Sequence, residues 1–448
     1  MSKILPISGF PEFSPAEQIV FNRVMDVIRR SYERVGAVPI ETSAVERIET
    51  LTAKGGNEKE IYALRRLAGE DGDDAKLMAL RFDLTVPLAR YAVQHMGTLT
   101  FPFRRYQMQP VWRGERPQAG RYRQFYQCDI DVIGDGTLSL INDAEMPVVI
   151  HRIFAELRIG PFMIAVNNRK ILSGFLSSIG LESEADVGTA MKVVDSMEKV
   201  GTQQTRGQLR ELGISEDNID KLVEFFSLAL KTDELLDVLR ERVANATMQE
   251  GLDELETVVK YMRMMGLPEQ NFRVDLSIAR GLDYYTGTVY ETRLTNHPGL
   301  GSICSGGRYE KLLRSLGADR DLPGVGISIG LTRLLPRLFE AGVMAVGPAT
   351  VAPVLVTTMD PDQLEKYLKF GAVLRSAGIN TEIYTEPKKL TAQMKYANRK
   401  GFSVVVIAGE EEFATDTVIV RRLVDGDQIQ VAQRDLVTTV VKLLGGAE

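Results

Sequence analysis

Hydrophobic and polar residues alternate with two different periods along the chain, and each period predicts its own kind of element. Residues 16–36 place apolar side chains at helical spacing, and the preceding Ser14-Pro15 pair is typical of a capped helix start. Residues 105–112 and 123–131 alternate and carry aromatic side chains, as half-buried strands do. The short polar stretch between these two strands predicts a hairpin.

The rest of the chain divides by the same criterion. Helical spacing dominates about 180–265, whereas strand patterns resume at Asn271. After Gly347-Pro348, predicted strands and helices alternate over about 100 residues, which predicts an α/β layer with a mixed sheet. The predicted division of the chain is 1–180, 181–265, 266–345 and 350–448.

Arginines gather around the predicted hairpin loop, which a turn at Pro117 and Gly120 closes. They are Arg113, Arg116, Arg121 and Arg123. Like charges around one loop repel one another, so a bound anion is one reason to keep them together. Guanidinium groups match phosphate oxygens in pairs, and the pattern therefore favours an anion-binding loop over a merely solvated one.

Acidic residues supply the second chemical signal. Asp129 and Asp131 share one face of the second strand with Phe125 and Gln127. Two aspartates on one face are costly if they are buried without partners, so this face is either wet or binds a cation. Farther upstream, residues 78–85 predict a strand and Val86 begins a helix. Asp83 at this junction is either a helix cap or a carboxylate that binds a substrate ammonium group.

Composition narrows the class of protein. The chain has 448 residues, which predicts two to four domains, and its 44% hydrophobic and 25% charged residues are those of a soluble globular protein. The net charge of −6 argues against a globally basic nucleic-acid binder but permits a local basic surface. No apolar run reaches the roughly 18 residues that span a bilayer, and no signal peptide is expected. Two cysteines suit a cytoplasmic location, and three scattered histidines predict no zinc site.

Several stretches resemble motifs of a known family. Arg113, Glu115 and 123–125 resemble motif 2 of the class II aminoacyl-tRNA synthetases, and 324–342 resembles motif 3. The stretches ARGLDYYTGTVYE (279–291) and ICSGGRYEKLL (303–313) identify the chain as a member of the histidyl-tRNA synthetase family. The N-terminal helix and the Pro39 strand resemble motif 1, which implies a homodimer. The resemblance implies an α+β catalytic domain with an antiparallel sheet, a helical insertion and a C-terminal α/β anticodon-binding domain.

The resemblance also implies an activity. Members of this family activate L-histidine with ATP and Mg²⁺ to histidyl-adenylate and pyrophosphate, and then transfer histidine to the 3′ end of tRNA-His. The alternative is the regulatory subunit of ATP phosphoribosyltransferase, a paralogue that senses histidine without charging tRNA. That paralogue would lose nucleotide-binding arginines or the C-terminal domain, whereas Arg113, Arg280, Arg333 and a C-terminal α/β unit are all present here.

The family's site residues carry over to named positions of this sequence. The histidine-binding set is Asp83, Thr85, Gln127, Asp131, Arg280, Tyr284, Tyr285, Gly306 and Tyr309. The ATP-binding set is Arg113, Glu115, Arg121, Arg123, Phe125 and Arg333, and the catalytic residues are Arg280 and Arg113. Asp83 departs from the Glu that bacterial members often have. The glycines of Ser305-Gly306-Gly307 predict a turn between a strand and a helix.

Overall fold

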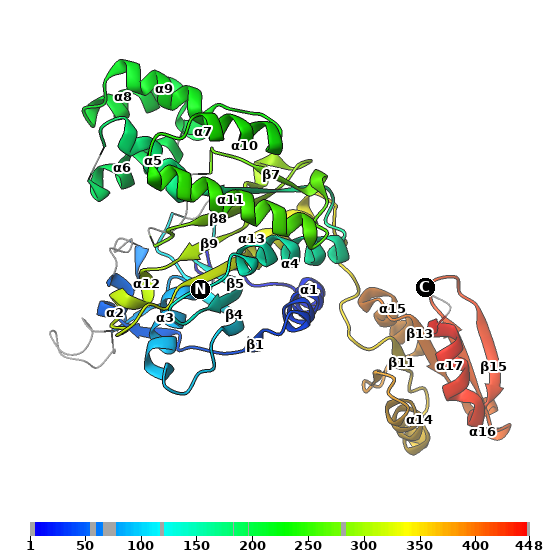
Figure 1. The fold of residues 1–448 in the computed structure, drawn as a ribbon. Coiled ribbons are helices and arrows are strands. Elements are labelled where there is room, and N and C mark those ends of the chain that lie inside the picture. The colour runs from blue at the N-terminus through cyan, green and yellow to red at the C-terminus, as the bar shows by residue number, and fades with distance from the viewer. Residues whose placement is uncertain are drawn as a thin grey trace. The chain divides into compact units, whose positions relative to one another are not determined.

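A computed structural model describes residues 5–53, 60–65, 78–116, 121–181, 183–195, 197–278 and 284–445. The chain forms two compact units, one of Met1–Pro11 and Val24–Met344 and the other of Glu12–Arg23 and Ala345–Glu448. Figure 1 traces the elements in chain order. None of the helices within the described ranges combines the length and the apolar character that crossing a bilayer requires.

The predicted N-terminal helix is present as α1 (Pro15–Arg34). Its start is a capping box, because the Ser14 N–H donates to Glu17 Oε2 (2.8 Å) and the Glu17 N–H donates to Ser14 Oγ (3.4 Å). Farther along the helix Ile28 and Tyr32 are fully buried, and the Tyr32 hydroxyl donates to the Cys128 carbonyl (2.8 Å). The apolar spacing read from the sequence is therefore the face that packs on the core.

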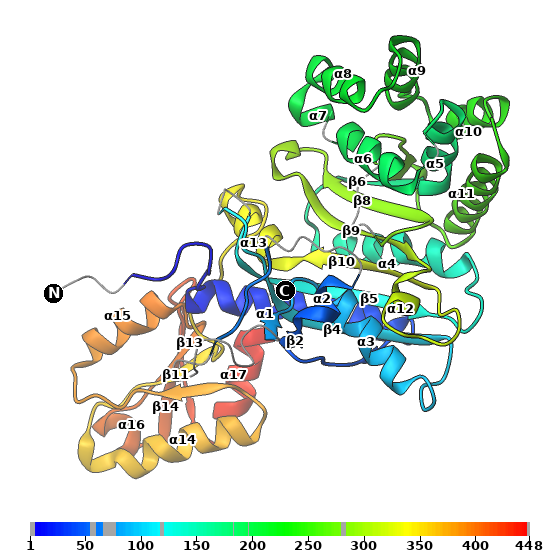
Figure 2. The same ribbon diagram turned by 90° about the vertical axis from the view of Figure 1, so that its left-hand side faces the viewer.

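An eight-stranded sheet forms the centre of the first unit (Figure 2). Its strands follow the order β1 (Val38–Pro39), β4 (Phe103–Trp112), β5 (Gln124–Ile133), β10 (Gly324–Gly330), β9 (Ser302–Tyr309), β8 (Thr288–Leu294), β6 (Phe162–Asn168) and β7 (Phe272–Val274). Neighbours from β4 to β6 are antiparallel, and only the two outermost pairs, β1 with β4 and β6 with β7, are parallel. The predicted hairpin is confirmed as β4 and β5. Pro39 lies in the edge strand β1, where a missing N–H is tolerated.

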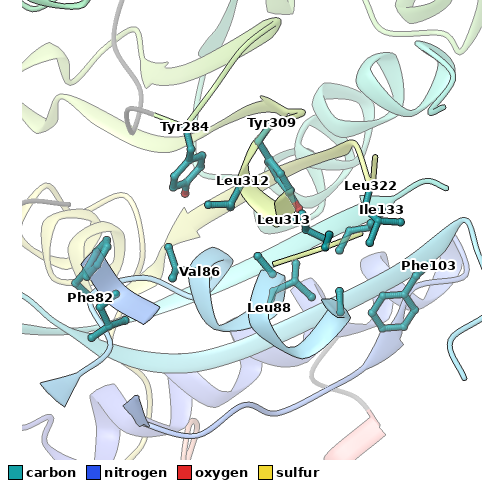
Figure 3. Packing of buried hydrophobic residues seen from close by; sticks show 14 of the residues in the cluster. Phe82, Val86, Leu88, Phe103, Ile133, Tyr284, Tyr309, Leu312, Leu313 and Leu322 are labelled. Atoms are coloured by element: carbon teal, nitrogen blue, oxygen red, sulfur yellow. The ribbon is translucent and has the colours of Figure 1, made fainter. Parts of the chain in front are cut away.

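Further helices and two short strands belong to the first unit. They are β2 (Val45–Arg47), α2 (Ile48–Thr52), β3 (Met78–Leu80), α3 (Thr85–His95), α4 (Ile141–Leu157), α12 (Leu312–Ser315) and α13 (Leu331–Glu340). Leu88 of α3 packs with Ile133 and Leu322 in one apolar cluster (Figure 3). The predicted strand 78–85 is wrong beyond Leu80. The Asp83 carboxylate accepts the Val86 N–H (3.1 Å), and this cap places Asp83 and Thr85 at a helix start.

A run of helices follows the sheet's β6. They are α5 (Arg169–Ser178), α6 (Glu184–Asp195), α7 (Met197–Val200), α8 (Thr202–Glu211), α9 (Glu216–Phe226), α10 (Thr232–Glu241) and α11 (Ala246–Met264). Figure 1 shows them gathered at the β7 end of the first unit. The helical character read from this stretch of sequence is confirmed.

The second unit holds a mixed five-stranded sheet, as the alternation of its elements predicted. Its order is β12 (Thr381–Ile383), β11 (Val354–Val356), β13 (Val404–Ile407), β14 (Thr417–Arg422) and β15 (Gln428–Ala432). The accompanying helices are α14 (Leu364–Ser376), α15 (Leu390–Lys400), α16 (Glu410–Ala414) and α17 (Leu436–Gly445). Successive β11 residues face opposite ways: Val354 packs with α14 and α17, whereas Leu355 packs with Ala397 of α15.

The glycines of residues 305–307 do not form the predicted turn. They lie inside β9, which continues to Tyr309 and pairs with β10 and β8 on its two sides. A Cβ atom at Gly306 would lie 2.2 Å from the Gly326 carbonyl oxygen, and one at Gly307 would lie 2.7 Å from the Thr288 carbonyl oxygen. Here glycine permits a close approach between strands rather than a change of chain direction.

We therefore expect Gly306→Ala to lower the free energy of unfolding by about 1–3 kcal/mol or more, because the methyl group must displace a neighbouring backbone. Urea denaturation followed by circular dichroism measures this change. Gly299→Ala is the matched control, since a Cβ atom there meets nothing within 4 Å. Equal stabilities of the two variants would contradict the steric argument.

Candidate active site

A cavity of about 850 Å³ opens in the first unit over β5, β9 and β10. Most of the predicted site residues that the structure describes line it: Thr85, Arg113, Glu115, Arg121, Phe125, Gln127, Tyr284, Tyr285, Gly306 and Arg333. Four others, Asp83, Arg123, Asp131 and Tyr309, are not among the residues that line it. Arg280 falls outside the described residues. The sequence motifs, which are far apart along the chain, thus converge on one cavity.

One wall of the cavity is cationic. Arg113 follows β4 directly; its guanidinium lies 5.0 Å from the Phe125 ring centre, and its Nε donates to the Phe82 carbonyl (3.0 Å). These two contacts fix the plane of the guanidinium group. Arg333 lies in the first turn of α13, where the helix dipole also favours an anion. Together with Arg121, these residues make a wall suited to phosphate oxygens.

The arginines of the hairpin loop have different environments. Arg121 lines the cavity and forms an exposed ion pair with Glu115 (3.1 Å). Arg123 instead turns to its own chain, since its Nε donates to the Glu115 carbonyl (3.2 Å) and its Nη1 to the Ser8 carbonyl (3.4 Å). In this structure, Arg123 braces the loop that carries Glu115. The loop tip at 117–120 lies outside the described residues.

Buried carboxyl groups lie on β5 and at the start of α3, which also carry residues that line the cavity. Asp83 is buried, and desolvation raises its pKa to about 6 although Val86 N–H, Arg113 and the Tyr284 hydroxyl favour its ionised form. The Tyr284 hydroxyl donates to Asp83 Oδ2 (3.2 Å). Desolvation also raises the pKa of Asp129, to about 7, and the pKa of Asp131. The site therefore holds more buried acid than is usual in a protein interior.

The part of the shared face that carries the two aspartates is not wet. Asp129 and Asp131 are each 2% exposed, and the cation beside them belongs to the chain itself. Arg105 Nη2 lies 2.8 Å from Asp131 Oδ2, and the Tyr309 hydroxyl donates to Asp131 Oδ1 (2.8 Å). Sequence reasoning missed Arg105. The available signal was the hairpin register, which places Arg105 directly opposite Asp131.

Two further polar residues of the cavity were also missed. Ser328 of β10 lines the cavity and accepts a hydrogen bond from Gln127 Nε2 (2.9 Å). Glu291 of β8 lines it as well. In the sequence, Ser328 stands out only as a polar residue between two isoleucines of a glycine-spaced strand. This pattern does not indicate which ligand the residue would bind.

A second buried ion pair supports the end of β9. Arg308 Nε donates to Asp143 Oδ1 (3.0 Å), and its Nη2 donates to Asp143 Oδ2 (2.5 Å) and to the Leu138 carbonyl (2.9 Å). Such a two-point contact fixes the guanidinium group and joins β9 to α4. Arg308 is therefore a structural residue, and it holds the strand that carries Gly306 and Tyr309.

An antiparallel sheet with an arginine-lined cavity over β5, β9 and β10, followed by α13, is the catalytic fold of a class II aminoacyl-tRNA synthetase. The chain belongs to the histidyl-tRNA synthetase family. The family model "Histidyl-tRNA synthetase" matches residues 9–334, and the model "Anticodon binding domain" matches residues 350–443.

Individual relatives agree with this assignment over the whole chain. The chain is 44% identical to the histidine–tRNA ligase of Nostoc sp., covering 98% of this chain and 97% of that one. It is 46% identical to that of Xanthomonas campestris, covering 96% and 94%. A crystal structure of the Nostoc histidyl-tRNA synthetase superposes with a TM-score of 0.88 at 43% identity, covering 99% of both chains. An ATP phosphoribosyltransferase regulatory subunit/histidyl-tRNA synthetase from Bacillus halodurans shares the fold alone, with a TM-score of 0.73 at 18% identity over 88% of this chain and 96% of that one.

The Arg105–Asp131 contact leads to a stability prediction. Asp131→Ala should lower the free energy of unfolding by about 3 kcal/mol or more, because Arg105 would stay buried without its closest counter-charge. Arg105→Met added to Asp131→Ala should recover part of this loss, since the uncompensated charge is then gone. Urea denaturation of both variants measures the difference. A double variant less stable than Asp131→Ala would contradict the ion-pair argument.

Proposed function

We propose that the protein is a histidine–tRNA ligase that activates L-histidine with ATP and transfers it to the 3′ end of tRNA-His. The observation that carries this proposal is one cavity lined by Arg113, Arg121 and Arg333, with the buried carboxyl group of Asp83 behind Tyr284, which also lines the cavity and donates to it. Arginines suit the phosphates of ATP, and buried carboxylates suit the ammonium group of an amino acid. Membership of the histidyl-tRNA synthetase family supports the choice of amino acid.

ATP occupies the arginine wall in this proposal. Arg113 binds the α-phosphate, and Arg333 binds the γ-phosphate together with Arg121 or Arg123. Phe125 is the platform on which the adenine ring stacks, and Glu115 completes the nucleotide site. The fixed position of Arg113 between Phe82 and Phe125 supports its role, because a preorganised cation stabilises developing charge without moving.

Histidine occupies the acidic side. Asp83, Thr85 and Gln127 bind its ammonium group, and Asp131 with Tyr285 binds the imidazole. Arg105 favours the ionised form of Asp131, which is the form that accepts an imidazole N–H. Tyr284, Gly306 and Tyr309 shape the pocket. A site that bonds a polar N–H rejects analogues lacking it far better than an apolar pocket does.

The chemistry requires mainly positioning and charge stabilisation. A carboxylate oxygen of histidine attacks the α-phosphorus of ATP in line, a new P–O bond forms, and pyrophosphate leaves. Arg113 stabilises the charge on the α-phosphate, and by family resemblance Arg280 does so too while binding the histidine carboxylate. The 3′ hydroxyl of the tRNA then attacks the carbonyl carbon and releases AMP. Mg²⁺ would neutralise the phosphates and would be held largely by the nucleotide itself, since the described residues contain no group of three or more His, Cys, Asp or Glu side chains that could hold a metal ion.

The remaining parts of the proposal concern the whole molecule. We assign 1–180 and 266–345 to the catalytic domain, 181–265 to an insertion, and 350–448 to anticodon binding. The match of an anticodon-binding model to residues 350–443 supports the last assignment. We further propose a cytoplasmic homodimer. Cys128 and Cys304 are both buried free thiols, which suits a reducing compartment.

Amino-acid-dependent ATP–pyrophosphate exchange, measured with each of the twenty amino acids, tests the proposal. We expect exchange with histidine alone. Absence of exchange, with histidine still binding in calorimetry, would favour the regulatory paralogue. The arginines of the cavity wall and the C-terminal unit argue against that outcome, because a sensor that binds no nucleotide and no tRNA needs neither.

The raised pKa of Asp83 predicts a pH dependence. Its carboxyl group loses its charge as the pH falls through about 6, and a neutral group attracts an ammonium ion weakly. Histidine affinity should therefore fall below that pH in addition to the change caused by the imidazole of histidine itself.

Asp83→Asn is the matched control. In this variant the imidazole of histidine and the carboxyl group of Asp129 still titrate, and only the titration of Asp83 is removed. The ratio of wild-type to Asp83→Asn affinity, measured by calorimetry, should fall about tenfold between about pH 7 and about pH 5. A ratio that stays constant over this range would rule out Asp83 as the titrating group that binds the ammonium.

A further inference from the structure

One hydrogen bond joins the first turn of α13 to β5. The Tyr126 N–H donates to Thr332 Oγ1 (2.8 Å), and Thr332 is only 1% exposed. The pairing of β10 with β5 ends where Gly330 lies opposite Gln127, and the chain continues from Gly330 into α13. The Thr332 hydroxyl therefore takes the place that the next carbonyl oxygen of β10 would have if the strand continued.

This hydrogen bond lies between residues that line the cavity. Phe125 and Gln127, on either side of Tyr126, both line it, and so does Arg333, which follows Thr332. Among the described residues that line the cavity, neither Tyr126 nor Thr332 is found. The strand that carries the aromatic ring and the helical turn that carries the guanidinium group are thus joined one residue away from each.

Apolar packing alone fixes the start of α13 less exactly than this hydrogen bond does. Leu331, Leu334 and Leu335 are buried, but contacts between apolar groups are not directional and tolerate small shifts of the helix. A hydrogen bond, in contrast, weakens steeply when its angle changes. Because the charged end of an arginine lies far from the helix axis, even a small rotation of α13 displaces the Arg333 guanidinium group.

Loss of the hydrogen bond should move α13 rather than β5. On one side β5 pairs with β4 from Gln124 to Ile133, and on the other it pairs with β10 from Gln127 to Ile133. The strand is therefore held by two neighbours, whereas α13 begins where the sheet ends. Phe125 and Gln127 should keep their positions while Arg333 moves.

We propose that Thr332 is a positioning residue that sets the place of Arg333 relative to Phe125 and Arg113. The Arg113 guanidinium lies 5.0 Å from the Phe125 ring centre, so these two side chains form one group at the hairpin. A ligand that contacts this group and Arg333 at once requires the correct spacing between them. An aromatic ring joined to a chain of phosphates, as in a nucleoside triphosphate, is such a ligand.

This inference rests on the proposed function in assigning ATP to the cavity, with its adenine on Phe125 and its γ-phosphate on Arg333. Thr332 itself does not touch the nucleotide. It acts through the position of Arg333, and its effect should therefore depend on the phosphates that a ligand carries.

Three ligands separate this role from a merely structural one. In the proposed site ATP with Mg²⁺ reaches from Phe125 to Arg333, AMP lacks the phosphates that Arg333 would bind, and histidine lies on the acidic side. Calorimetry with each ligand alone gives three dissociation constants without any catalysis. In Thr332→Val, which keeps the shape of the side chain and removes the acceptor, we expect ATP to bind about tenfold more weakly. AMP and histidine should change by less than about twofold.

Two variants serve as controls. Thr332→Ser restores the hydroxyl group and should bind all three ligands within about threefold of wild type. Thr232→Val removes a comparable acceptor, because Thr232 Oγ1 accepts the Val274 N–H (3.3 Å) at the start of α10 and is 8% exposed. Thr232 is not among the residues that line the cavity, so this variant should bind all three ligands within about twofold of wild type.

Urea denaturation shows whether each variant is folded under the conditions of the calorimetry. If Thr332→Val does not fold, Thr332→Ala provides the same comparison. The smaller side chain leaves room for a water molecule at the Tyr126 N–H, and such a water satisfies the donor without fixing the helix. The same pattern is expected, with a loss for ATP alone.

A double variant tests whether Thr332 acts through Arg333. Arg333→Ala removes the group that Thr332 positions, so adding Thr332→Val to it should weaken ATP binding by less than about twofold further. Independent roles would instead give the product of the two separate losses.

The outcomes are distinct. A Thr332→Val variant that weakens ATP and AMP equally, or neither of them, overturns the positioning role, and so do a failure of Thr332→Ser to restore ATP binding and independent losses in the double variant. If the wild type binds ATP but gives no histidine-dependent exchange, the proposed function fails while the Thr332 comparison still stands. If exchange occurs and Thr332→Val does not discriminate between ATP and AMP, the proposed function stands and this inference fails.

Discussion

The burial of three carboxyl groups with incomplete charge compensation determines the chemistry of the cavity. Asp83, Asp129 and Asp131 all have raised pKa values because they are desolvated. Arg105 compensates Asp129 and Asp131 only in part, and Arg113 does the same for Asp83. An interior with an excess of acid gains stability from any further positive charge that enters it. The amino group of an amino acid is such a charge. Negative charge in this interior is therefore compensated incompletely, and the ammonium group of the proposed substrate would compensate it further.

The glycines of β10 make room for this arrangement. Gly326 pairs with Asp131 across one strand boundary, and Gly324 pairs with Tyr309 across the other. A Cβ atom at Gly326 would lie 2.0 Å from Asp131 Oδ1, and one at Gly324 would lie 2.1 Å from the Tyr309 ring. The hydrogen bond from Tyr309 to Asp131 therefore passes over a strand that has no side chains in its way. The glycines of β10 are therefore as necessary for this arrangement as the charged residues are.

Local patterns predicted the elements better than the contacts between them. The α1 capping box and the β4–β5 hairpin depend on residues a few positions apart, and both could be read from the sequence. The same local patterns led to the wrong prediction of a turn at 305–307, because glycine occurs both in turns and where neighbouring strands approach closely. Asp83 offers a different case. Its two alternatives, cap and ligand, are not exclusive, since one carboxyl oxygen caps α3 and the other accepts from Tyr284.

Arginine shows most clearly why the site could be predicted only in part. A guanidinium group has five N–H donors, and when it is buried the protein must satisfy them. Arg81 and Arg308 obtain their partners from the chain: Arg81 donates to the Thr42 and Pro110 carbonyls, and Arg308 to Asp143, 165 residues away. Arg113 also donates to a chain carbonyl, that of Phe82, but its side chain lines the cavity. Which partners an arginine has in the chain depends on the groups that the fold brings close, and Arg123, which donates to the Glu115 carbonyl, shows that this holds for a motif residue too.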